Sequence, residues 1–211
     1  RGVYPFVYRM ASGVSTYLPP EILVLPHGLP SWFGPNGERV TVADGGVGGP
    51  HQQPDLVTML RGVYALGNTP MVFNAMLPKR IEDLTPETRD KFLHYAAIYK
   101  AFIRPMLATS KVFHHAPINA TGGVESSDWF AMEFASPDKT KAWATVIRLS
   151  RTETEPYLFK PRGLDSAKSY RVTFDNTAKT QVLAGSRLMA DGVLLPLAAE
   201  PLSELLLFEA Q

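Results

Sequence analysis

The pattern of apolar residues changes near Ala116, and this change constrains the fold more than any other feature of the sequence. C-terminal to Ala116, short apolar runs recur with Gly, Pro, Asp and Asn between them. Runs of this length and spacing are typical of an antiparallel sandwich. We therefore predict a β-sandwich domain over residues 116–211, with strands at 129–134, 142–149, 157–160, 170–174, 193–197 and 205–208. Its expected core includes Trp143, Val146, Tyr170, Val172 and Leu206.

The residues before Ala116 follow a different pattern. Apolar residues at helical spacing predict a helix from about residue 54 to 66, with Gly67 at its C-terminal cap. Segment 71–77 is apolar without polar alternation, which is typical of a parallel strand that is buried on both faces. The sequence thus predicts a helix and then a buried strand.

A second helix is predicted after this strand. Thr85-Pro86-Glu87 supplies an N-cap, a first-turn proline and an acidic residue at the positive end of the helix dipole. The apolar stripe that follows predicts a long amphipathic helix that ends or kinks near Pro105. Helix, buried strand and helix in this order predict that residues 1–115 are the C-terminal strands and helices of a (β/α)8 barrel.

The composition limits the classes of function. Lys and Arg number 21 against 20 Asp and Glu, so there is no basic excess to neutralise phosphates, and no nucleic-acid partner is expected. No apolar stretch approaches the ~20 residues that span a bilayer, so we expect a soluble chain without a membrane partner. The lack of cysteine excludes disulfide scaffolds, thiol nucleophiles and thiolate metal sites. We expect no metal and no cofactor, and the sequence leaves the compartment open.

Two groups of motifs occur in a fixed order along the chain. In the predicted barrel segment stand His51-Gln52, Arg61 with Ala65 and Gly67, Leu84-Thr85-Pro86-Glu87 and Tyr99-Lys100. In the predicted sandwich stand Arg162-Gly163-Leu164-Asp165, Tyr170-Arg171-Val172, and Gly185 with Leu188-Met189 and Gly192. In this order they resemble the motifs of the glycoside hydrolase family 36 α-galactosidases. The resemblance is strong after His51 and weak before it, where residues 32–49 depart from the family's pattern.

This resemblance implies the C-terminal portion of a retaining α-galactosidase. In a retaining glycosidase one carboxylate attacks the anomeric carbon and a second protonates the leaving oxygen, ~5 Å away. The family carries both aspartates on earlier barrel strands, so no residue of this chain is expected to be catalytic. A barrel needs ~250 residues, so residues 1–115 are too few to close one. We expect an α-galactoside as substrate, and the missing barrel half or a second copy of the chain as partner.

Five loop residues are candidate substrate-binding groups under this resemblance: His27, Trp32, Asp44, His51 and Gln52. They would follow barrel strands, where barrel enzymes place their active sites. The polar side chains would exchange hydrogen bonds with sugar hydroxyls, and the indole would offer an apolar face to a pyranose ring. The ordinary interpretation of each one alone is a loop residue whose hydrogen bonds are met by backbone or water.

Two other interpretations of the chain stay open. One is a non-catalytic carbohydrate-binding or structural module, and the other is a related glycosidase with a different sugar. Trp129, Trp143 and Tyr157 would form a carbohydrate platform if exposed on one face, but aromatic residues in alternating strands usually fill the core, which we favour. We expect packing and edge roles for His114 and His115, because neighbouring residues in a strand point to opposite faces and cannot share a metal ion.

Overall fold

The computed structural model describes residues 18, 55–67, 84–115, 129–149 and 155–211 of the chain. The chain divides into two compact units, Arg1–Pro105 and Met106–Gln211. The predicted buried strand at 71–77 lies outside the described residues. The barrel assigned to residues 1–115 and the domain boundary near Ala116 therefore stay predictions.

The first predicted helix is confirmed as α2 (Leu56–Tyr64) in the first unit. Its N-cap is Asp55, whose carboxylate accepts the backbone N–H of Thr58 at 2.8 Å and the Thr58 hydroxyl at 2.7 Å. The first of these bonds satisfies a backbone donor that the start of a helix otherwise leaves free. The helix ends earlier than predicted, with Ala65 and not Gly67 as its C-cap residue. Gly67 follows with a φ of 74°, a conformation that glycine adopts without strain.

The second predicted helix is confirmed as α3 (Pro86–Ile98), which continues into a π-helical turn, η5 (Tyr99–Ile103), and a 3-10 helix, η6 (Arg104–Thr109). Thr85 is the N-cap residue as predicted, but its hydroxyl bonds to the Thr88 hydroxyl at 3.0 Å and makes no capping bond to the backbone of the helix. The predicted kink near Pro105 takes the form of this change of helix type. The Arg104 N–H reaches back to the Tyr99 carbonyl, which is a π-helical bond. The next residue, Pro105, has no N–H and cannot continue an α-helical ladder.

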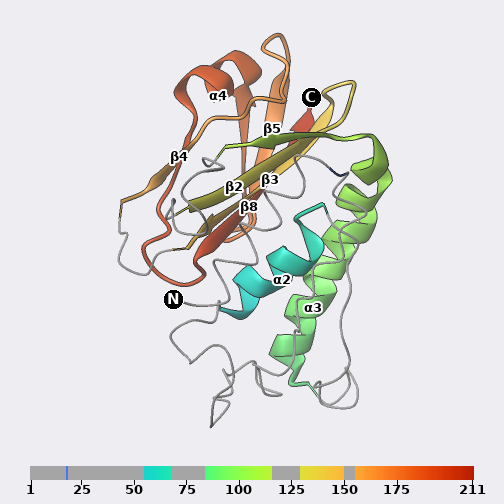
Figure 1. Ribbon diagram of the computed structural model, residues 1–211, viewed down its shortest axis with the longest axis vertical. Coiled ribbons are helices and arrows are strands. Elements are labelled where there is room, and N and C mark those ends of the chain that lie inside the picture. Colours follow the sequence, from blue (N-terminus) through green and yellow to red (C-terminus); the bar gives the residue numbers. More distant parts are fainter. Residues whose placement is uncertain (1–17, 19–54, 68–83, 116–128, 150–154) are drawn as a thin grey trace. The chain divides into compact units, whose positions relative to one another are not determined.

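The second unit is built on a six-stranded antiparallel sheet and a separate two-stranded sheet (Figure 1). The large sheet has the order β1-β2-β3-β8-β5-β6, and β4 pairs with β7. The antiparallel part of the predicted fold is thereby confirmed. The strands are β1 (Lys111–His114), β2 (Trp129–Ala135), β3 (Lys141–Arg148), β4 (Tyr157–Phe159), β5 (Ser169–Phe174), β6 (Lys179–Ala184), β7 (Val193–Leu195) and β8 (Ser203–Ala210).

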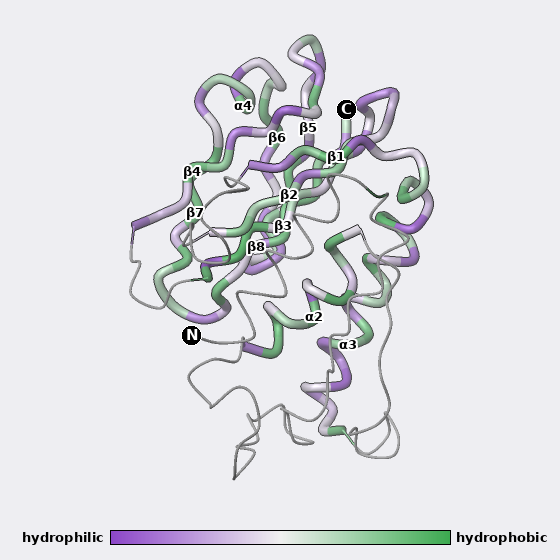
Figure 2. The backbone as a smooth tube through the Cα atoms, in the orientation of Figure 1, coloured by the Kyte–Doolittle hydropathy of each residue, from purple (hydrophilic) through white to green (hydrophobic). Residues whose placement is uncertain are grey.

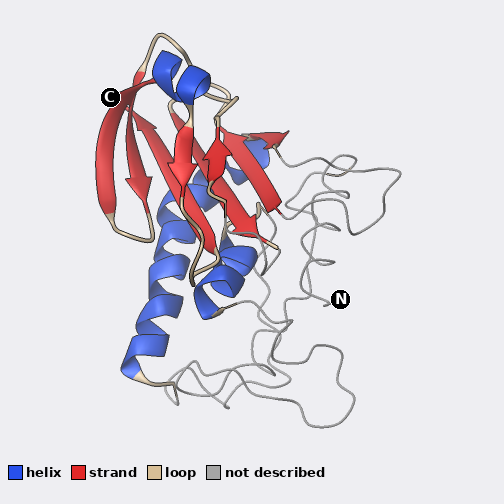
Figure 3. Cartoon of the chain, turned by 90° about the vertical axis from the view of Figure 1, so that its left-hand side faces the viewer, coloured by secondary structure: helices blue, strands red, loops and turns tan. Residues whose placement is uncertain are grey.

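One face of the large sheet is covered by β4, β7 and the short helix α4 (Gly185–Asp191), which Figure 3 shows at one end of the strands. Alternate side chains of each strand reach this face, as the two-residue period of a strand requires. Four of the five predicted core residues are confirmed there. The core cluster contains Val146, Tyr170, Val172 and Leu206 from the large sheet, and Phe159, Leu164, Leu188 and Leu195 from the segments that cover it.

Trp143 is fully buried but faces away from this cluster. Its neighbours on β3, Ala142 and Ala144, belong to the cluster, so the indole points to the opposite face. There it stacks on Phe134, the residue opposite it on β2, with ring centroids 4.4 Å apart and planes at 6°. β2, β3 and β8 are therefore apolar on both faces, and Figure 2 shows hydrophobic colour along them.

Candidate functional site

The five candidate substrate-binding residues, His27, Trp32, Asp44, His51 and Gln52, lie outside the described residues. Their arrangement around a sugar stays a prediction. The motif residues of the sandwich, by contrast, are all described. They meet around the segment between β4 and β5, residues 160–168, which we call the 160–168 turn.

Gly163 brings the 160–168 turn into direct contact with β2. A Cβ at this position would lie 2.5 Å from the Cβ of Ala135 and 2.8 Å from the Phe113 ring, so no side chain fits. The Gly163 N–H donates to Oε1 of Glu133 at 2.8 Å. The glycine of the motif is thus needed because the turn's backbone itself contacts the strand.

Asp165 and Tyr170 join the 160–168 turn to the hairpin between β2 and β3. The Asp165 N–H donates to Oη of Tyr170 at 2.9 Å, and the Tyr170 hydroxyl donates to the Lys139 carbonyl at 2.7 Å. The Asp165 carboxylate accepts the Ala167 N–H at 3.0 Å, which closes the turn. Burial raises the pKa of Tyr170, so the phenol keeps the proton with which it donates to the Lys139 carbonyl.

Two further motif glycines lie at the ends of α4: Gly185 is its first residue and Gly192 is its C-cap. A Cβ on Gly185 would lie 2.1 Å from the Asp165 carbonyl oxygen, and the Gly185 N–H donates to the Lys168 carbonyl at 2.7 Å. Gly192 follows the helix with a φ of 78°, and its N–H donates to the Leu188 carbonyl at 3.0 Å. The helix is therefore fixed between the two glycines, and Leu188 between them is buried in the core cluster.

Glu133 is a buried carboxylate that was not predicted from the sequence. Its side chain has no exposed surface, and its oxygens accept the N–H groups of Arg162 and Gly163, each at 2.8 Å. Nε2 of His115 lies 2.7 Å from Oε2, and the His115 ring packs on Phe159 with centroids 4.7 Å apart. His115 therefore has the packing role that was predicted. A carboxylate enclosed in this way cannot reach a substrate.

Trp129 and Tyr157 are half-buried and pack against the core cluster. Their ring centroids lie 5.1 Å apart with planes at 41°. With Trp143 fully buried on the other side of the sheet, the three aromatic residues do not share an exposed face. This arrangement favours the predicted packing role over a carbohydrate platform.

Burial raises the pKa of Tyr157 to about 12. The folded state therefore favours the neutral phenol, and its contribution to stability is complete below the unfolded pKa of about 10 and is lost as the pH rises towards 12. We expect the tyrosinate absorbance of the native chain to include a component that titrates near pH 12 and that Tyr157→Phe removes. If the titration curves of the native chain and Tyr157→Phe differ only near pH 10, Tyr157 is solvated instead.

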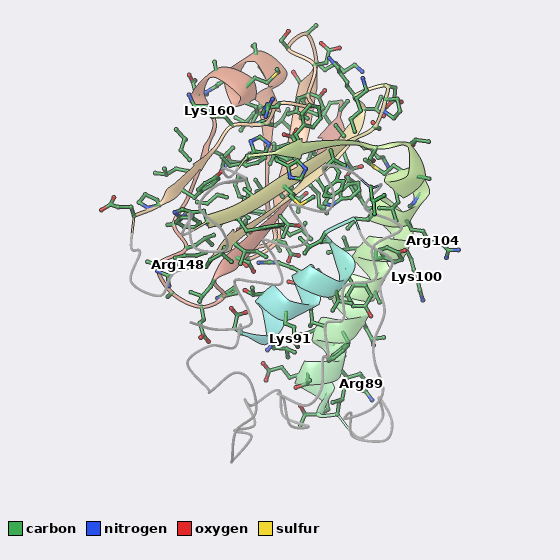
Figure 4. The ribbon with its side chains drawn as sticks, viewed as in Figure 1. Arg89, Lys91, Lys100, Arg104, Arg148 and Lys160 are labelled. Atoms are coloured by element: carbon green, nitrogen blue, oxygen red, sulfur yellow. The ribbon has the colours of Figure 1, made fainter. Side chains whose placement is uncertain are left out.

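In the first unit, helices α2 and α3 meet through motif residues. Arg61 is fully buried, and its guanidinium carbon lies 5.7 Å from the centroid of the Tyr95 ring. The rings of Tyr64 and Tyr99 lie 6.1 Å apart, and burial raises the pKa of Tyr64. Arg61 and Tyr99 thus serve the contact between the helices, whereas Figure 4 shows Lys100 and Arg104 pointing away from α2.

The described residues make their contacts within the fold. Within them, no group of three or more His, Asp or Glu side chains is arranged to hold a metal ion. Across the same ranges, no helix has the length and apolar character needed to span a membrane. The motif residues instead hold turns, helix ends and strands together.

This architecture defines the second unit as an antiparallel β-sandwich domain with a motif-bearing turn docked on its sheet. Residues 129–208 match the family model of the glycosyl hydrolase family 36 C-terminal domain. This match confirms the resemblance indicated by the sequence motifs. No curated protein sequence matches the chain significantly.

Several solved structures share the fold. The galactosidase domain of an α-galactosidase–sucrose kinase is 13% identical and superposes with a TM-score of 0.61, covering 99% of this chain and 25% of its own. An α-galactosidase from Lactobacillus brevis is 19% identical with a TM-score of 0.59, covering 86% of this chain and 23% of its own. A family 36 α-galactosidase from Geobacillus stearothermophilus in complex with stachyose is 16% identical with a TM-score of 0.50, covering 81% and 21%.

Because all three identities are low, these similarities establish a common fold and nothing more. The chain spans about a quarter of the length of the solved proteins that it matches. What those proteins bind or hydrolyse is therefore a property of much longer chains.

Proposed function

We propose that this chain is the C-terminal region of a retaining glycoside hydrolase that acts on α-galactosides. The catalytic carboxylates would be supplied by residues upstream of Arg1, and the loops before the sandwich would add contacts to the sugar. An α-galactoside is the proposed substrate, and the rest of the catalytic barrel or a second copy of the chain is the proposed protein partner.

The observation that carries the proposal is the match of residues 129–208 to the family 36 C-terminal domain. The geometry of the motif glycines supports it, because Gly163, Gly185 and Gly192 each occupy a position where a side chain meets backbone or a neighbouring strand. The solved structures with which the chain shares the fold include α-galactosidases. Together these findings favour an α-galactosidase over an unrelated sandwich module.

The sandwich is proposed to stabilise the enzyme and not to bind sugar itself. Its central strands are apolar and buried on both faces, so they offer no open surface to a sugar. Of its aromatic pairs, Phe134 and Trp143 are fully buried, and Trp129 and Tyr157 pack on the core. A carbohydrate-binding module would instead present an exposed aromatic face.

The purified 211-residue chain is expected to show no turnover of a chromogenic α-galactoside, because the family's two catalytic aspartates lie upstream of the matched motifs. The gene product extended upstream of Arg1 is expected to hydrolyse the same substrate and to release α-galactose as the first product. Activity is measured by release of the chromophore, and the product anomer by NMR. Matched chromogenic α-glucosides and β-galactosides test whether the extended product prefers a different sugar or a different anomeric linkage.

Turnover by the isolated chain that survives rigorous purification, and is lost in Asp44→Asn, would contradict the proposal and make that loop catalytic. An extended product that is folded but hydrolyses only another glycoside would keep the family and change the substrate. A circular dichroism spectrum of each sample excludes loss of the fold as the reason for inactivity.

A further inference from the structure

The Glu133 carboxylate joins three segments that are distant in sequence. It lies in the middle of β2 without exposed surface. Oε2 is bonded to Nε2 of His115 at 2.7 Å and accepts the Arg162 N–H at 2.8 Å, while Oε1 accepts the Gly163 N–H at 2.8 Å. Because an ionised carboxylate can only accept, His115 donates from Nε2. One buried side chain thus holds both the residue that follows β1 and the 160–168 turn.

The turn and β1 also contact each other directly. Nη1 of Arg162 donates to the His114 carbonyl at 3.3 Å, and the guanidinium carbon lies 5.8 Å from the centroid of the Phe113 ring. β1 lies at one edge of the large sheet. It follows η6, and the Ser110 hydroxyl caps the end of η6 by donating to the Met106 carbonyl at 2.7 Å. β1 is therefore the strand by which the chain enters the sheet.

We propose that Glu133 and His115 form a latch that makes β1 and the 160–168 turn open together, as one local unfolding unit. A buried carboxylate is tolerated only while donors surround it. If either segment leaves, the Glu133 carboxylate loses donors, and the remaining segment is held less strongly. His115 is a positioning residue in this device, because it acts on the turn only through Glu133. The inference is independent of the proposed enzymatic function.

Amide hydrogen exchange of the 211-residue chain, followed by NMR, tests the coupling in both directions. In Glu133→Gln the probe is the backbone N–H of His115, which donates to the Ala131 carbonyl at 3.0 Å and has no bond to Glu133. In His115→Phe the probes are the Arg162 and Gly163 N–H groups, which bond to Glu133 and not to His115. We expect each probe to exchange about ten- to a hundredfold faster, which corresponds to losing a hydrogen bond to a charged group. The N–H groups that pair β3 with β8 are expected to exchange at unchanged rates.

The controls separate the hydrogen bond from packing and from charge. His115→Phe keeps an aromatic ring on Phe159, and His115→Gln, which can again donate to Glu133, is expected to restore much of the protection of the turn. Glu209→Gln removes a carboxylate that pairs with Arg171 at 3.1 Å on the surface, and is expected to leave all probes unchanged. If Glu133→Gln fails to fold, the pair of His115 variants still decides. The latch would be overturned if the His115 N–H exchanged at its normal rate in Glu133→Gln and the Arg162 and Gly163 N–H groups did so in His115→Phe.

Discussion

Replacing Trp143 by alanine is expected to lower the free energy of unfolding of the sandwich by about 3 to 5 kcal/mol. The indole is fully buried and lies in the central part of the sheet, opposite Phe134 on β2 and Leu207 on β8. Its removal leaves a cavity beside the Phe134 ring, on which the indole stacks with the ring centroids 4.4 Å apart. Strands on both sides are paired along their length, so the backbone cannot collapse into the space.

Urea unfolding followed by far-ultraviolet circular dichroism measures this change. Val182→Ala is the matched control, since Val182 is 63% exposed on the edge strand β6, and its loss should cost less than about 0.5 kcal/mol. A cost near zero for Trp143→Ala would place the indole on the surface. Equal costs for the two variants would mean that burial in the sheet does not decide the stability of the domain.

Gly185→Ala is expected to destabilise the domain by about 1 to 3 kcal/mol or more, although it adds a single methyl group. That methyl group would lie 2.1 Å from the Asp165 carbonyl oxygen and 3.0 Å from the Lys168 carbonyl oxygen. Both neighbours are backbone atoms, so a side-chain rotation cannot relieve the contact. The start of α4 must move away from the 160–168 turn, and the 2.7 Å bond from the Gly185 N–H to Lys168 is lost.

Ser186→Ala, at the next position of α4, is the control for this substitution. Ser186 is exposed, and alanine suits a helix, so its unfolding midpoint should be unchanged or slightly higher. Thermal unfolding of both variants gives the comparison. If Gly185→Ala unfolds at the temperature of the unaltered chain, the close approach of α4 to the turn does not exist in solution.

The predicted apolar runs correspond to β2, β3, β4, β5, β7 and β8, each of which carries apolar residues between turn residues. β2, β3 and β8 appear as apolar runs because both of their faces are buried. β6 was not predicted, because residues 179–182 are exposed and show no apolar alternation. β1 and α4 were not predicted because they are short, and α4 begins with glycine, which local propensity does not favour in a helix.

The motif residues of the turn could be recognised in the sequence, but their common partner could not. Glu133 stands alone in the apolar run of β2, and a single carboxylate in such a run is a signal of a buried group with specific donors. Those donors come from His115, Arg162 and Gly163, at separations of 18 to 30 residues. No local spacing can indicate such contacts, because they depend on how the strands pair.

The strand order has a consequence for how the domain assembles. β8 is the latest strand in the sequence, yet it pairs with β3 on one side and β5 on the other. Until residues 203–210 have been synthesised and inserted, the sheet exists only as two pieces, each with an open edge. Folding must therefore wait for a contact between distant parts of the chain, which makes it slow, and the two open edges are exposed to other chains meanwhile. A nascent or truncated chain that lacks β8 should need a chaperone to stay in solution.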